Sequence, residues 1–217
     1  MQCRQINTNG ARYRRMNQEQ TVEFWRWFAA NSDRLARHLE SKGDFTELDQ
    51  RISALFDGSL SWEVGPGQRK PYALAISPSG RRTALEATRQ IVSAAPTLEQ
   101  WEFHAAKPPK AWSPHFVFEG AEGQERSVDA TNWEYVLSQL PKGGFDITVR
   151  APGLDNWSEQ DKLWAAEIAL DGMLGELTRL ECIHGIEVVR NLDEGLQQKA
   201  TPIGFIREHL GSLLELE

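Results

Sequence analysis

The chain is poor in cysteine and has no long apolar run. Its two cysteines, Cys3 and Cys182, are too far apart in sequence to define a disulfide framework, and this low content favours a reducing, cytoplasmic location. No apolar run approaches the roughly 20 residues that span a bilayer. Residues 1–20 also lack the apolar segment of a signal peptide. We therefore expect no membrane partner.

Basic charge is also scarce. Lys and Arg number 24 against 31 Asp and Glu, which gives a net charge of −7. Such a chain repels a phosphate backbone unless its basic residues cluster, and the cluster we identify is Arg12, Arg14 and Arg15. We therefore expect no nucleic-acid partner. A protein partner with a basic surface is the natural complement of an acidic chain.

Familiar catalytic and cofactor motifs are missing. The glycine-containing stretches, Gly65-Pro66-Gly67 and Ser77-Pro78-Ser79-Gly80, match neither a P-loop nor a dinucleotide fingerprint. No Gly-x-Ser-x-Gly elbow occurs, so a hydrolase triad lacks its usual anchor. The histidines do not have zinc-protease spacing. We predict turns at the glycines and neither a cofactor nor a metal.

Apolar periodicity does predict regular structure in the first half of the chain. Residues 1–18 are polar, and we expect a disordered tail there. The regular pattern begins just after Met16, so Met1 and Met16 are equally good candidates for the first residue of the protein. Spacing typical of helices and alternation typical of strands then predict helices over 21–40, 46–57 and 82–95 and strands over 60–64, 72–76 and 101–105.

The second half shows a related pattern. Ser158 is a candidate N-cap for a long helix, with Glu159 and Asp161 favourable in its first turn. Residues 133–140 fit a helix and a strand equally well. The remaining spacing predicts strands over 115–119, 125–128, 145–150 and 185–190 and helices over 158–177 and 204–217.

Both halves therefore contain a β-β-α-β order. We predict an α+β protein made of two ferredoxin-like halves, residues 19–110 and 111–217, with a helical pair before the first and a helix after the second.

Three stretches resemble an uncharacterised family of bacterial proteins. These are Phe24-Trp25-Arg26-Trp27-Phe28, the Ala95-Pro96 turn before Trp101, and the run from Leu170 to Glu176. In order and spacing they cover roughly residues 20–190. The family is distantly similar in fold to domains of the regulator of ribonuclease activity B. The resemblance implies this fold and offers no catalytic residues to carry over.

Carboxylates provide the candidate catalytic residues. Asp171 lies one helical turn after Glu167, and Glu176 lies about one turn beyond Asp171. Carboxylates at this spacing can bind a divalent cation or do acid–base work, but a solvated helix face or a loop cap is the explanation we favour. His104 is the third candidate. These residues support an alternative hypothesis, in which the protein is an enzyme whose carboxylate-based site lies at the junction of the two halves.

Aromatic residues provide the candidate binding residues. The eight tryptophans are an excess, and tryptophan is enriched where proteins bind one another. Trp112 and Trp157 fall in loops, whereas Phe24 and Trp27 lie off the main apolar stripe of the first helix. We therefore predict a non-enzymatic regulatory or protein-interaction protein, inhibitor- or immunity-like, with Trp27, Trp112, Trp157 and Phe24 as binding residues.

Overall fold

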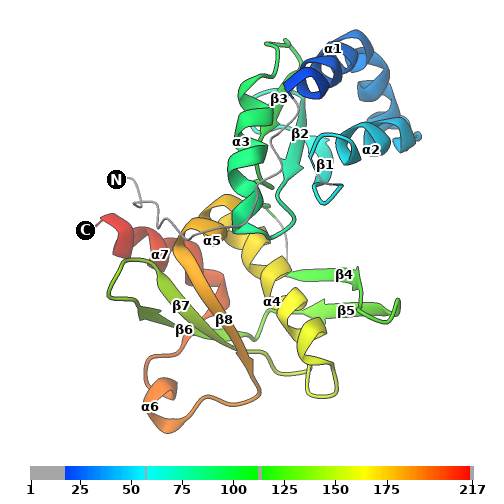
Figure 1. The fold of residues 1–217 in the computed structure, drawn as a ribbon. Coiled ribbons are helices and arrows are strands. Elements are labelled where there is room, and N and C mark those ends of the chain that lie inside the picture. Colours follow the sequence, from blue (N-terminus) through cyan, green and yellow to red (C-terminus); the bar gives the residue numbers. More distant parts are fainter. Residues whose placement is uncertain (1–17, 57, 112–113, 216–217) are drawn as a thin grey trace. The chain divides into compact units, whose positions relative to one another are not determined.

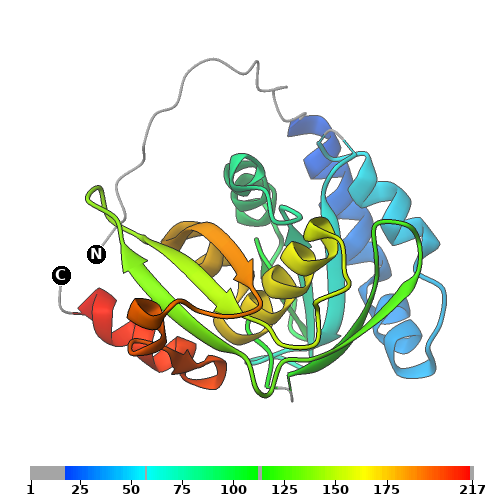
Figure 2. The same cartoon turned by 90° about the horizontal axis from the view of Figure 1, so that it is seen from below.

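The computed structural model describes residues 18–56, 58–111 and 114–215 and shows a mixed α+β protein with three small sheets (Figure 1; turned by 90° in Figure 2). The predicted tail, apart from Gln18, lies outside these residues. Contacts divide the chain into two compact units, Met1–Lys107 and Pro108–Glu217. The sequence pattern placed the boundary after residue 110. Each unit is described by itself below.

The N-terminal unit pairs a three-stranded sheet with helices. Strand β2 lies in the middle, antiparallel to β1 and parallel to β3, and the chain crosses from β2 to β3 through α3. The elements are α1 (Gln18–Ser41), α2 (Thr46–Ser53), β1 (Ser61–Pro66), β2 (Tyr72–Ser77), α3 (Leu85–Ser93) and β3 (Trp101–His104).

Aromatic rings from α1 form much of the core of this unit. The ring of Phe28 meets that of Trp101 edge to face at 5.1 Å, and Trp25 meets Phe103 at 4.7 Å. The buried indole of Trp25 also donates a hydrogen bond to the carbonyl oxygen of Ile91 on α3, at 2.7 Å. Edge-to-face packing and a satisfied indole are what a buried aromatic cluster requires.

One part of the predicted α1 stripe is wrong. Phe24 lies off the predicted stripe but is only 2% exposed, whereas Val22 is 49% exposed. Phe24 precedes Phe28 by four residues, so both rings lie on one face of the helix. The aromatic residues therefore determine which face of α1 is buried.

The C-terminal unit contains a two-stranded and a four-stranded sheet. The larger sheet has the order β8-β7-β6-β9. Residues 133–140, whose sequence fits a helix and a strand equally well, contain strand β6. The elements are β4 (His115–Glu119), β5 (Glu125–Asp129), β6 (Glu134–Gln139), β7 (Phe145–Arg150), α4 (Glu159–Leu174), α5 (Glu176–Cys182), β8 (Ile183–Val189), α6 (Glu194–Gln197), β9 (Thr201–Pro202) and α7 (Ile206–Glu215).

The two units share one strand order. In each, an antiparallel hairpin is followed by a helical crossover to a strand parallel with its second strand, β1-β2-α3-β3 in one and β6-β7-α4-α5-β8 in the other. The predicted β-β-α-β order is therefore present twice. The ferredoxin-like form is not confirmed, because β2 and β3 are direct neighbours, as are β7 and β8, whereas a split unit leaves a strand between them.

The long helix predicted over residues 158–177 is interrupted. Its start is confirmed, since the Ser158 hydroxyl accepts a hydrogen bond from the backbone N–H of Asp161. Its end is wrong, because Gly175 takes φ 83° and ψ 144° and separates α4 from α5. Leu177, the last residue of the predicted helix, lies beyond the break and is exposed.

The predicted C-terminal helix also begins differently. A 3-10 turn at Ile203–Phe205 precedes α7. Phe205 is exposed, whereas Ile206 and Leu210 are buried. The tighter winding of the turn shifts the register of the buried face relative to an α-helix that starts at residue 204.

Replacing Gly175 by Ala should destabilise the protein by about 1–3 kcal/mol, because this backbone conformation is essentially restricted to glycine. Gly211→Ala is the control. Gly211 lies within α7 with no atom near the position of a new Cβ, so this change should stabilise by up to about 1 kcal/mol. Urea denaturation measures both, and equal effects would show that the break at Gly175 is incidental.

Candidate functional site

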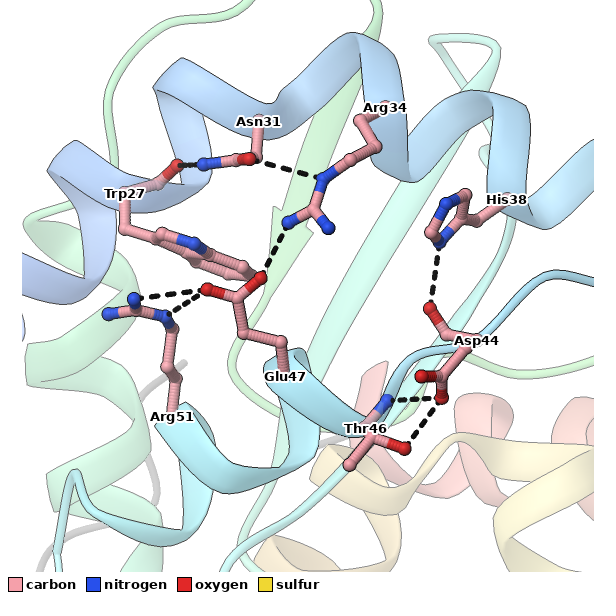
Figure 3. Close-up of polar contacts among 8 residues, drawn as sticks. All are labelled: Trp27, Asn31, Arg34, His38, Asp44, Thr46, Glu47 and Arg51. Atoms are coloured by element: carbon pink, nitrogen blue, oxygen red, sulfur yellow. Dashed lines mark hydrogen bonds and ion pairs between the residues drawn. The ribbon is translucent and has the colours of Figure 1, made fainter.

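Trp27 lies on α1 and is half-buried beneath an arginine. The guanidinium of Arg51, on α2, sits 4.5 Å from the centre of the indole ring (Figure 3). Glu47 holds this guanidinium at 3.1 Å through one carboxylate oxygen and accepts a 2.7 Å hydrogen bond from Arg34 through the other. The hydrogen bond from Arg34 lowers the pKa of Glu47, so the acid stays ionised. One face of the predicted binding residue is thus covered from within the unit.

Trp157, just before α4, has the same arrangement. The guanidinium of Arg126 lies 4.8 Å from the centre of its ring and pairs with Asp161 at 2.9 Å. The Asp161 side chain is almost completely buried, and it also accepts hydrogen bonds from the backbone N–H of Ala121 at 2.8 Å and from Gln124 at 3.1 Å. The hydrogen bond from Ala121 is the main reason that the pKa of Asp161 is lowered.

Phe24 and Trp112 are the other two predicted binding residues. Phe24 belongs to the core of the N-terminal unit, where its ring contacts Trp25 at 4.7 Å. Trp112 lies outside the described residues. Cation–π stacking stabilises a fold as readily as it captures a partner. The observed contacts show that Trp27 and Trp157 are packed within their own units, and their role in binding stays a prediction.

The candidate catalytic carboxylates of the C-terminal unit surround one buried arginine. Arg179, on α5, is only 4% exposed. Its guanidinium forms a two-point ion pair with Asp171, with N···O distances of 2.5 and 3.3 Å, and lies 3.5 Å from Glu167. Glu176 is also buried, and its charge acts on Arg179 and Glu167.

Burial sets the electrostatics of this cluster. Burial raises the pKa of Glu167 and outweighs the opposing attraction of Arg179, while the charge of Glu176 raises it further. For Arg179, burial lowers the pKa, but the hydrogen bond and charge of Asp171 prevail and raise it. The guanidinium therefore stays charged, and its pairing with Asp171 ties α4 to α5 across the break at Gly175.

His104, the third catalytic candidate, belongs to the N-terminal unit. Its ring contacts Glu102 on the same strand at 3.1 Å. Glu102 also accepts hydrogen bonds from the backbone N–H groups of Gln68, Arg69 and Lys70 in the turn between β1 and β2. Burial would raise the pKa of Glu102, but these hydrogen bonds and His104 outweigh it and lower the pKa to about 2. Glu102 thus anchors a turn.

Acidic charge is unevenly distributed along the chain. Residues 1–107 carry 15 Lys and Arg against 12 Asp and Glu, a net charge of +3. Residues 108–217 carry 9 against 19, a net charge of −10. The overall acidity of the protein therefore comes entirely from the C-terminal unit. A separate charge count for each half of the sequence would have found this asymmetry.

The hairpin of β4 and β5 presents one face to solvent. Phe116 and Phe118 pack against the core of the C-terminal unit from its other face. On the outer face Val117 lies opposite Ser127 and is 57% exposed, and Glu119 lies directly opposite Glu125. We call these four residues the outer hairpin face. It combines an exposed apolar side chain with two exposed carboxylates.

No family model matches the chain, and no curated protein or solved structure matches it either. Within residues 18–56, 58–111 and 114–215, no helix is long and apolar enough to cross a membrane. In the same ranges, no three side chains of His, Cys, Asp or Glu form a group that could hold a metal ion.

The double change Asp171→Asn with Glu176→Gln should destabilise the protein by about 3 kcal/mol, because it leaves a buried guanidinium without its main counter-charge. Glu159→Gln is the control, since this exposed acid pairs with Lys162 at the surface and its loss should change the free energy of unfolding by less than about 0.5 kcal/mol. Chemical denaturation checks both. Unchanged stability in the double variant would leave these carboxylates available for catalysis.

Glu102 should make stability depend on acid pH. Its folded pKa of about 2 lies below the ordinary 4.5, so its contribution is present above pH 4.5 and is lost as the pH falls through about 2. Glu102→Gln should therefore lessen the fall in unfolding free energy across this window. Glu99→Gln, an exposed carboxylate of the same unit, should leave the fall unchanged. Identical profiles for all three proteins would refute the role of Glu102.

Proposed function

We propose that the protein is a non-enzymatic regulatory or interaction protein that binds a basic protein partner through its C-terminal unit. The observation that carries the proposal is the net charge of −10 on residues 108–217. A field of one sign speeds the encounter with an oppositely charged protein and disfavours wrong partners. An inhibitor- or immunity-like protein that masks a basic surface would use such a field.

The contacts of the candidate residues support binding over catalysis. Asp171 is engaged by Arg179 in a two-point ion pair, and Glu102 and His104 hold a turn. The charges of these groups are therefore balanced by ion pairs and hydrogen bonds within the fold. Trp27 and Trp157 are likewise occupied by Arg51 and Arg126. Recognition in this proposal is therefore mainly electrostatic, and the tryptophans support the scaffold that carries the charge.

The repeated β-β-α-β order supports a further part of the proposal. The two units would be diverged copies of one ferredoxin-related element, and the chain would be a relative of the uncharacterised bacterial family. Only the C-terminal copy is acidic, and such a difference would arise if one of two duplicated units had taken on binding of the basic partner.

Affinity capture tests the proposed function. The tagged full chain should retain a basic protein from a lysate of its source cells at about 0.1 M salt and release it at about 1 M, because the screening length falls from about 10 to about 3 Å. A retained acidic partner, or retention unaffected by salt, would contradict the proposal.

The purified partner then separates binding from catalysis. Its activity should change in proportion to the amount of the protein added and should reach a plateau at an equimolar ratio. Catalysis would instead modify the partner at a small fraction of that amount. A chemical change in the partner, detected by mass spectrometry, would favour an enzyme.

A further inference from the structure

The outer hairpin face carries an electrostatic cost that the fold does not relieve. Like charges directly opposite one another on neighbouring strands destabilise a sheet. Glu119 and Glu125 are such a pair, and Glu122 in the connecting turn adds a third exposed carboxylate. No cationic side chain of the described ranges pairs with these three. Arg126, their neighbour in sequence, projects to the opposite face and pairs with Asp161.

The backbone of the hairpin leaves hydrogen-bonding groups at its edges. Hydrogen bonds join Ala130 N–H to the Pro114 carbonyl at one end and Gly120 N–H to the Gln124 carbonyl at the other. Because bonded and non-bonded pairs alternate in an antiparallel ladder, Val117 and Glu119 direct their backbone groups away from β5. Within the described residues β4 and β5 pair only with each other, so these groups lie at an unpaired edge.

We propose that the outer hairpin face is the docking site of a basic extended segment that pairs with an edge of the hairpin. This inference rests on the proposed function and names the surface and the form of the partner. The segment's backbone bonds to the edge. Its Lys or Arg side chains neutralise Glu119 and Glu125, and an apolar side chain between them covers Val117.

The charge on the face also selects against another occupant. A second copy of this chain would bring further carboxylates against Glu119, Glu122 and Glu125 and increase the repulsion. A basic segment removes it. The proposal therefore commits to a foreign basic strand rather than to self-association.

A synthetic peptide of alternating lysine and valine tests the proposal on the full chain. The peptide should bind in calorimetry at low salt. Glu119→Gln with Glu125→Gln should weaken binding at least about tenfold, since both counter-charges are lost. Glu194→Gln with Glu208→Gln removes the same charge from exposed positions of this unit outside the hairpin and should weaken binding less than about twofold.

A second readout separates binding from a structural role. The Glu119→Gln, Glu125→Gln variant should unfold at a higher urea concentration than the unaltered protein, because it relieves the cross-strand repulsion while losing the peptide. Loss of both stability and binding would show that the two acids support the fold and would overturn the proposal.

The peptide itself tests edge pairing. An analogue with N-methyl groups on alternate residues keeps its charges but cannot complete the ladder, and it should bind at least about tenfold more weakly. Equal binding of the analogue, equal effects of the two double variants, or no peptide binding would each overturn the docking site. So would dimerisation that the hairpin variant abolishes, measured by sedimentation. A basic partner captured by the unaltered chain and equally by the hairpin variant would leave the proposed function standing.

Discussion

Helix α4 is held near both ends by ion pairs in which one partner is buried, and these pairs attach the hairpin and α5 to it. Asp161 in its first turn pairs with Arg126 of the hairpin, and Asp171 in its last turns pairs with Arg179 of α5. A charge removed from water must be matched by an opposite charge and by hydrogen bonds, or it destabilises the fold by several kcal/mol. This requirement determines how the hairpin and α5 are attached to α4.

Local patterns in the sequence predicted much of the fold. Strand alternation and helical spacing located most elements, and the Ser158 cap followed from one residue type. The Arg179 pairing could not be found in this way, because residues 171 and 179 would lie about 12 Å apart along a continuous helix, well beyond the spacing at which side chains of one helix meet. They meet only because Gly175 breaks the helix, and a lone glycine in a helical pattern does not reveal its φ. The sequence therefore pointed to the carboxylates Asp171 and Glu176 but not to Arg179, the cation that pairs with Asp171.

The cation–π contacts of Trp27 and Trp157 are a second feature that the sequence does not reveal. The sequence predicted surface indoles at Trp27 and Trp157, and the structure finds each half-buried under an arginine that an acid holds in place. Such a stack joins residues far apart in sequence and depends on tertiary packing, so no local sequence pattern predicts it. Net charge, in contrast, is a sum over residues, so counting the charged residues of each half identifies the C-terminal half as acidic.

The anchoring of the β1–β2 turn has a consequence for the order of folding. Three successive N–H groups of this turn point to Glu102, a residue more than thirty positions later in the chain. A hairpin turn usually forms early, from its own residues. This one reaches its final hydrogen bonding only once β3 has docked beside β2, after α3 has closed the crossover. The hydrogen bonds that complete this turn therefore belong to the non-local, slower steps of folding.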